Sequence, residues 1–193
     1  MREELDTRLV KKYPKIFVDR YKGMLETCMY WGFECGDGWY WLIDNLCQSI
    51  QSYIDSNSYK TTIKNKITRK LYKFIRKLTL SSKYKPWKYN LYNWIWKVAK
   101  KEKIESIGQV VATQVKEKFG GLRFYYNGGD QLIDGMIRLA EHESYYICEE
   151  CGSTEHVGIT KEGWLFVRCK NCAEKLNLIG WKEYGENDNE SEV

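Results

Sequence analysis

Four of the seven cysteines form two pairs with the spacing of metal ligands. Cys148-x-x-Cys151 is followed, after seventeen residues (152–168), by Cys169-x-x-Cys172. Two such pairs let four thiolates converge in a tetrahedron around a borderline-soft ion such as Zn(II). Because four thiolates leave no open position for water or substrate, we expect a structural zinc site. The alternative is that the pairs form redox disulfides, but the sequence around them lacks the βαβ pattern of such proteins. The other cysteines are expected to be buried apolar thiols: Cys28, Cys35 and Cys47.

The other polar residues with catalytic potential do not form a known pattern. Two carboxylates and a lysine could hold Mg(II) and steer a phosphodiester, as in metal-dependent nucleases. No Asp/Glu-x-Lys follows a predicted strand, and Asp37 is placed to cap a helix. The chain has only two histidines, and neither lies in a Ser or Cys nucleophile motif. We therefore assign no catalytic residue and keep a nuclease as an alternative, with these candidates: Glu34, Asp37, Glu117, Lys118 and Arg123.

The charge of the chain is divided unevenly. The formal net charge is +5, from 31 basic and 26 acidic residues. Residues 56–101 hold 14 Lys or Arg and no Asp or Glu, which leaves 31 − 14 = 17 basic and 26 acidic residues, a net of −9, elsewhere. Such asymmetry indicates a polyanionic partner or an acidic protein surface. The alternative is that the basic segment docks on the acidic remainder of its own chain.

The basic insert, residues 56–101, is predicted to be a helical hairpin. From Ile63 to Leu78, apolar and cationic residues fall on opposite sides of a helix with 100° per residue. Pro86 can begin a second, aromatic helix, and this favours a folded hairpin over a basic helix lying on an anionic membrane. The partner is then nucleic acid or an acidic or nucleic-acid-binding host protein. Its contacts are expected to be Lys66, Arg69, Lys70, Lys73, Arg76, Lys77, Lys85, Lys88 and Trp87.

The remaining elements form the expected core. Residues 39–54 have a 3.6-residue apolar period, with Asp44 among the polar residues of the opposite face. Alternating residues on either side of Gly120-Gly121 predict a β-hairpin, and Asp130 is placed to cap a further amphipathic helix. The first helix and the hairpin should pack together and bury Leu42, Leu46, Ile50, Val115 and Phe124.

These patterns predict an α+β fold, with amphipathic helices packed on a small antiparallel hairpin or sheet. Residues 1–55 and 102–145 would form the core, 56–101 the basic aromatic helical insert, 146–182 a zinc-ribbon or treble-clef-like module, and 183–193 a disordered acidic tail. A hydrophobic share of 43% excludes full disorder. No apolar stretch reaches the roughly 18 residues of a membrane span, and the N-terminus has no secretion-signal pattern. We therefore expect a soluble, cytosolic protein.

Three motifs together resemble a widespread group of uncharacterised bacteriophage and prophage proteins. They are ECGDGWYWLIDNLC at residues 34–47, QVKEKFGGLRFY at residues 114–125 and the two CxxC pairs. The resemblance covers most of the chain outside the basic insert and implies a phage accessory protein in the bacterial cytoplasm. It brings no characterised activity. The expected function is binding of a polyanion through the insert; the alternatives are inhibition of a bacterial antiphage defence system and a metal-dependent nuclease.

Overall fold

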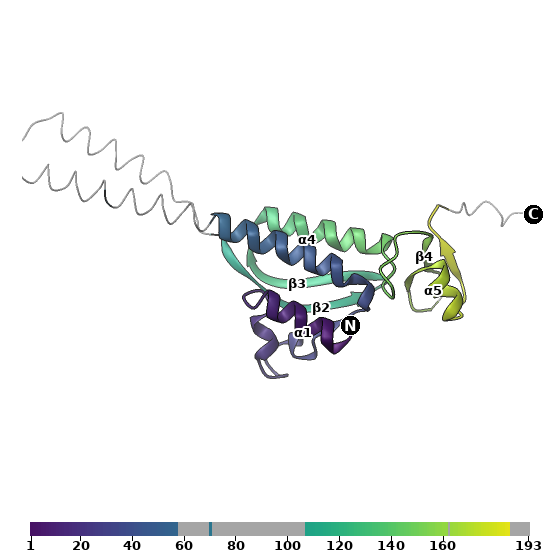
Figure 1. Cartoon of the computed structure of the whole chain (residues 1–193), viewed down its shortest axis with the longest axis horizontal. Helices are drawn as coiled ribbons and strands as arrows, with labels where there is room; N and C mark the ends of the chain where they lie inside the picture. Colours follow the sequence, from purple (N-terminus) through teal and green to yellow (C-terminus); the bar gives the residue numbers. More distant parts are fainter. Residues whose placement is uncertain (58–69, 71–106, 162, 186–193) are drawn as a thin grey trace, which may run out of the picture. The chain divides into compact units, whose positions relative to one another are not determined.

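The computed structural model describes residues 1–57, 70, 107–161 and 163–185 (Figure 1). The chain divides into two compact units, one made of Met1–Ser52 with Gly108–Val193 and the other of Tyr53–Ile107. The second unit contains the basic insert. Of residues 56–101, the structure describes only residues 56, 57 and 70, so the predicted helical hairpin lies almost entirely outside the described residues. Within the described part of the chain, no helix is long and apolar enough to cross a membrane.

A three-stranded sheet forms the centre of the first unit. Its order is β1 (Phe33–Glu34), β2 (Gly108–Lys118) and β3 (Gly121–Gly129). β2 and β3 form the antiparallel hairpin that the alternating sequence predicts, and β1 adds to β2 in parallel. Register shifts between Gly108 and Gln114 interrupt the alternation, so the apolar set remains on one face through both halves of β2. That face is buried.

Two helices cover the buried face of the sheet. One runs over residues 40–57 and the other is α4 (Gln131–Glu143), which the Asp130 side chain caps by accepting from Leu132 N and Ile133 N. The amide side chains of Gln51 and Gln109 bond across from the first helix to β2. Figure 1 shows both helices above the strands. All five residues predicted to lie in this core are buried: Leu42, Leu46, Ile50, Val115 and Phe124.

The N-terminal segment covers the rest of this core. It contains α1 (Glu3–Lys12) and two 3-10 turns, η1 (Val18–Tyr21) and η2 (Cys28–Trp31). The Phe17 ring packs edge-on against Phe33, with ring centroids 4.9 Å apart, and also meets Phe124.

Contact with α1 overturns one sequence expectation. Asp44 was expected on the solvent face of its helix, yet its side chain is buried. It accepts from Lys12 Nζ at 2.8 Å and from Tyr13 Oη at 3.0 Å. The helical periodicity of this segment cannot reveal that α1 packs on its polar side at Asp44, whereas most of the other residues of that side are exposed as expected.

A second small sheet carries the C-terminal cysteines. It has the order β5 (Val167–Cys169), β4 (Val157–Thr160) and β6 (Trp181–Glu183), and α5 (Lys170–Lys175) follows β5. Glu183, the first residue of the expected tail, is part of β6, where it pairs with Gly158 of β4. Its carboxylate also forms a hydrogen bond with the His156 ring. Residues 186–193 of that tail lie outside the described chain. The described fold is therefore α+β, as the sequence predicts.

Candidate metal centre

The four predicted ligands lie together. The Sγ atoms of Cys148, Cys151, Cys169 and Cys172 are all within 4.8 Å of one another. The Cys151 and Cys169 sulfurs are 3.7 Å apart, whereas a disulfide needs about 2.05 Å. A tetrahedral site with metal–sulfur bonds of about 2.3 Å places its sulfurs about 3.8 Å apart. The spacing therefore suits four thiolates around one metal ion.

Secondary structure on both sides sets the positions of these thiols. Cys148 and Cys151 lie in the turn after η4 (Ser144–Tyr146); Cys169 ends β5, and Cys172 lies in α5. Burial raises the pKa of the Cys148 thiol, but backbone N–H donors, chiefly those of Cys151 and Cys169, outweigh it and lower the net pKa. The backbone of the turn thus favours the thiolate, the form that binds metal, at Cys148. Burial raises the pKa of Cys151, the other thiol of this turn. Of the other three cysteines, Cys35 and Cys47 are buried as expected, but Cys28, the first residue of η2, is exposed.

The first cysteine turn packs directly on the glycines of the ECGDGW motif. Gly36 N donates to Glu149 Oε1 at 2.8 Å, and Gly38 N donates to the Glu149 carbonyl at 2.8 Å. A Cβ at Gly38 would lie 2.2 Å from the Cys148 carbonyl oxygen. The indole of Trp39 completes the contact by donating to the Ile147 carbonyl at 2.9 Å. These glycines are required by the close approach of the cysteine turn, which is 113 residues away in sequence.

A buried ion pair links the two cysteine pairs. Arg168 NH1 lies 2.6 Å from Glu149 Oε2, and the two side chains are 10% and 8% exposed. Arg168 also donates to the Val167 carbonyl, and it reaches the exposed Glu150 carboxylate only at 3.9 Å. Glu149 therefore holds Gly36 with one oxygen and Arg168 with the other.

The hairpin turn of the core also meets the cysteine module. A Cβ at Gly120 would lie 2.9 Å from Ile159 Cδ1, and one at Gly121 would lie 2.5 Å from the Tyr145 ring. Both long motifs of the resemblance thus supply glycines where the module touches the core. Sequence reasoning attributed Gly120 and Gly121 to the hairpin turn alone.

The candidate nuclease residues are not brought together as a metal site. Glu34 accepts from Gln114 Nε2 at 3.0 Å, and Glu117 accepts from Gly120 N at 2.6 Å. Arg123 donates to Tyr145 Oη at 3.0 Å. The cysteine set is the only group of three or more His, Cys, Asp or Glu residues with metal-binding geometry among residues 1–57, 70, 107–161 and 163–185.

Asp37 has a different role from the one predicted. Its carboxylate accepts from the backbone N–H of Arg2 at 2.7 Å and pairs with the Arg2 guanidinium, and no cap to its own 3-10 turn forms. Burial raises the pKa of Asp37, but the hydrogen bonds and ion pair with Arg2 lower it by more than burial raises it. The pKa of Asp37 therefore lies below its ordinary value. The residue joins the start of α1 to the ECGDGW segment instead of capping the helix that follows it.

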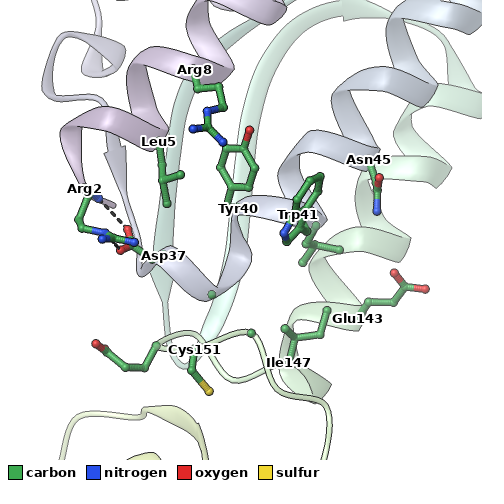
Figure 2. A pocket seen from close by; sticks show the side chains of 14 residues that line it. Arg2, Leu5, Arg8, Asp37, Tyr40, Trp41, Asn45, Glu143, Ile147 and Cys151 are labelled. Carbon is green, nitrogen blue, oxygen red and sulfur yellow. Dashed lines mark hydrogen bonds and ion pairs between the residues drawn. The ribbon is translucent and has the colours of Figure 1, made fainter.

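A pocket of about 560 Å³ lies beside the metal centre (Figure 2). Its wall comes from α1, from the start of the helix of residues 40–57, from the end of α4 and from the first cysteine turn. Two arginines face it, but Arg2 pairs with Asp37 and Arg8 with Glu4. No sequence signal predicts this pocket, because four distant segments line it.

The predicted contact residues of the insert are mostly beyond the described chain. Lys70 is described, and its side chain is exposed. The other predicted contacts lie outside the described residues: Lys66, Arg69, Lys73, Arg76, Lys77, Lys85, Trp87 and Lys88.

In comparisons with known proteins, no family model, curated protein or solved structure matches this chain.

Proposed function

We propose that the four cysteines hold one structural Zn(II) ion. All four ligand positions would be thiolates, which suits zinc and leaves no site for substrate. The second pair lies where β5 meets α5, after the β4–β5 hairpin. This order of cysteine turn, hairpin and helix supports a treble-clef-like module in preference to a zinc ribbon, whose second pair would lie in another turn.

The protein then acts by binding, through the basic insert. The observation that carries this proposal is the charge of residues 56–101, where 14 basic residues have no acidic neighbour in the same segment. Cations so placed repel one another, and phosphate neutralisation with release of counterions would stabilise them. The proposed partner is nucleic acid or a host nucleoprotein complex, and the resemblance of the three motifs to phage proteins supports a site of action in the bacterial cytoplasm.

Catalysis is the weaker proposal. Glu34, Asp37, Glu117 and Arg123 are each engaged in contacts that hold the fold together. Inhibition of a host defence protein remains an alternative, because the same basic surface could enter an acidic or nucleic-acid-binding groove.

Elemental analysis of protein purified without chelator tests the metal. One zinc per chain is expected, and Cys148→Ser should lower stability because metal binding is coupled to folding. Protein without stoichiometric zinc would contradict the assignment.

Salt-dependent binding tests the insert. Replacing Lys70, Lys73 and Lys77 by Glu should weaken binding to duplex DNA and remove about three phosphate contacts from the salt dependence, close to 2.7 in the slope of log K against log salt. A charge-matched control replaces three exposed lysines outside the insert, Lys11, Lys170 and Lys175. Equal losses in the two variants would contradict a specific role for the insert.

Co-purification from bacterial cells separates the alternatives. If the partner is nucleic acid, it should disappear after nuclease treatment and leave the protein alone. A host protein that remains bound after nuclease would favour inhibition, and cleavage of added nucleic acid that depends on Glu34 or Asp37 would favour a nuclease.

A further inference from the structure

The central sheet has a second face that carries polar and aromatic side chains. We call this the outer face; it comprises Glu34, Gln114, Lys116, Lys118, Arg123 and Tyr125, with the Tyr145 ring over Gly121. These side chains alternate with the buried apolar set, so they leave the strands on the opposite side. Each is half-buried or exposed. The outer face is built almost wholly from the QVKEKFGGLRFY motif.

The register arranges these residues in two rows. Along β2 lie Gln114, Lys116 and Lys118, and along β3 their register partners are Tyr125, Arg123 and Gly121. From residue 114 to residue 118 the row extends about 13 Å at roughly 3.3 Å per residue. This length is enough for a short run of unstacked bases.

The cations of the outer face lie beside aromatic rings. Lys116 Nζ is 5.8 Å from the centroid of the Tyr125 ring, and Lys118 Nζ is 5.2 Å from that of Phe119. The Arg123 guanidinium lies 6.0 Å from the Tyr145 ring. Such alternation of cations and flat rings is typical of surfaces that hold single-stranded nucleic acid.

The charge of the outer face is unbalanced. Within the described chain, no carboxylate lies within ion-pair distance of Lys116 or Lys118. Glu34 is the one acid of the face, and it accepts from Gln114 instead. Three cations against one carboxylate leave a net charge of +2, which complements phosphate.

Phe119 is the strongest sign of a ligand. It is the first residue of the two-residue hairpin turn and has a φ of 55°, the left-handed region in which Asn or Gly is favoured. Its ring is also 65% exposed. Neither backbone conformation nor burial accounts for a phenylalanine here, although both would be satisfied by asparagine. A ligand that stacks on the exposed ring would account for it.

We propose that the outer face, with Phe119 at its end, binds single-stranded nucleic acid. The bases would stack on Phe119 and Tyr125, while Lys116 and Lys118 contact the phosphates. The outer face shares no residue with the basic insert. The proposal rests on the proposed function only in that the partner is nucleic acid.

Fluorescence anisotropy with a labelled dT10 oligonucleotide, on the full chain, tests the proposal. Phe119→Asn should bind dT10 about 5- to 150-fold more weakly, the equivalent of about 1–3 kcal/mol for one stacked base. The same variant should melt about 2–8 °C higher, because asparagine removes the backbone strain. A protein that is more stable but binds less is not expected from a merely structural residue.

Two controls make the result specific. Leu139→Asn changes a side chain of similar exposure, 59%, on α4, which packs against the opposite face, and it should leave dT10 binding unchanged. A duplex of the same length should be affected less than twofold by Phe119→Asn, because its bases are already stacked. Equal weakening of duplex and single strand, or no weakening of either, overturns the proposal.

A lysine variant gives a second, independent measurement. Lys116→Gln with Lys118→Gln should lower the salt slope for dT10 by about 1.4, at about 0.7 per phosphate contact. An unchanged slope overturns the phosphate contacts, even if Phe119→Asn does not fold.

The insert variant separates the two surfaces. In protein carrying the glutamate replacements at Lys70, Lys73 and Lys77, the effect of Phe119→Asn on dT10 should persist. Loss of duplex binding alone would then support the insert, and residual dT10 binding sensitive to Phe119 would support the outer face even if the insert proved inactive. Wild-type protein that does not bind dT10 at 50 mM salt overturns the outer-face proposal.

Discussion

Removal of the buried Glu149 carboxylate should strongly destabilise the protein near the metal centre. Glu149→Ala leaves Arg168 buried without its charge partner and leaves the Gly36 N–H without an acceptor. Breaking one side of a buried ion pair costs about 3–5 kcal/mol, because the remaining charge stays desolvated. We therefore expect the free energy of unfolding to fall by about 3–5 kcal/mol.

The neighbouring glutamate supplies a matched control. Glu150 lies between the same two cysteines, but its side chain is 57% exposed and 3.9 Å from Arg168. Glu150→Ala should cost less than about 1 kcal/mol, as exposed ion pairs usually do. Glu149→Gln keeps an acceptor for Gly36 but loses the charge, so its loss should fall between the two.

Urea denaturation followed by circular dichroism, with zinc present in excess, measures all three variants. The urea midpoint of unfolding should drop least for Glu150→Ala, more for Glu149→Gln and most for Glu149→Ala. The m-values should be unchanged if unfolding remains two-state. Equal losses for the two alanine variants would refute the reasoning, since they would show that the buried pair contributes no more than the exposed one.

Three further changes test the core and its contacts. Leu46→Ala should lower the free energy of unfolding by about 2–5 kcal/mol in the same denaturation assay, because the side chain is buried; an unchanged midpoint would contradict this packing. Gly38→Ala should cost about 2–4 kcal/mol, from overpacking against the Cys148 carbonyl and a lost hydrogen bond. Its control, Gly135→Ala on the open side of α4, should instead stabilise by about 0.5–1 kcal/mol. Asp37 has a net pKa below its ordinary 3.8, so its ion pair should stabilise the fold fully above about pH 4 and lose effect as pH falls through the lowered pKa. The stability difference between wild type and Asp37→Asn should shrink over that acid range; a difference independent of pH would exclude the charge effect.

Local patterns predicted the local elements well. The β-hairpin, the Asp130 cap and the convergence of the cysteines each depend on residues close in sequence or on one repeated spacing. Periodicity also identified the buried face of the helix of residues 40–57, because one contiguous apolar stripe defines it.

Contacts between distant segments were not predictable in this way. Asp44 was assigned to solvent because nothing in its own helix shows that Lys12 and Tyr13 cover it. Asp37 was assigned to a cap for the same reason, although its partner is Arg2. The glycines of the ECGDGW motif have a visible signal, two glycines flanking an acid, but the backbone they admit lies more than a hundred residues away. Sequence pattern shows that a glycine is needed and does not show what approaches it.

The distance between Gly36 and Glu149 along the chain has a consequence for synthesis. Ribosomes add about 5–20 residues per second, so the 113 residues that separate these partners take about 6–23 s to make. During that interval the N-terminal segment has been made, but the turn that covers its glycines has not. The surface of the first helices around these glycines therefore stays uncovered until the cysteine turn has been made and has folded. If the cysteines hold the proposed zinc ion, a shortage of zinc in the cell would lengthen this interval and expose the newly made chain to proteases for longer.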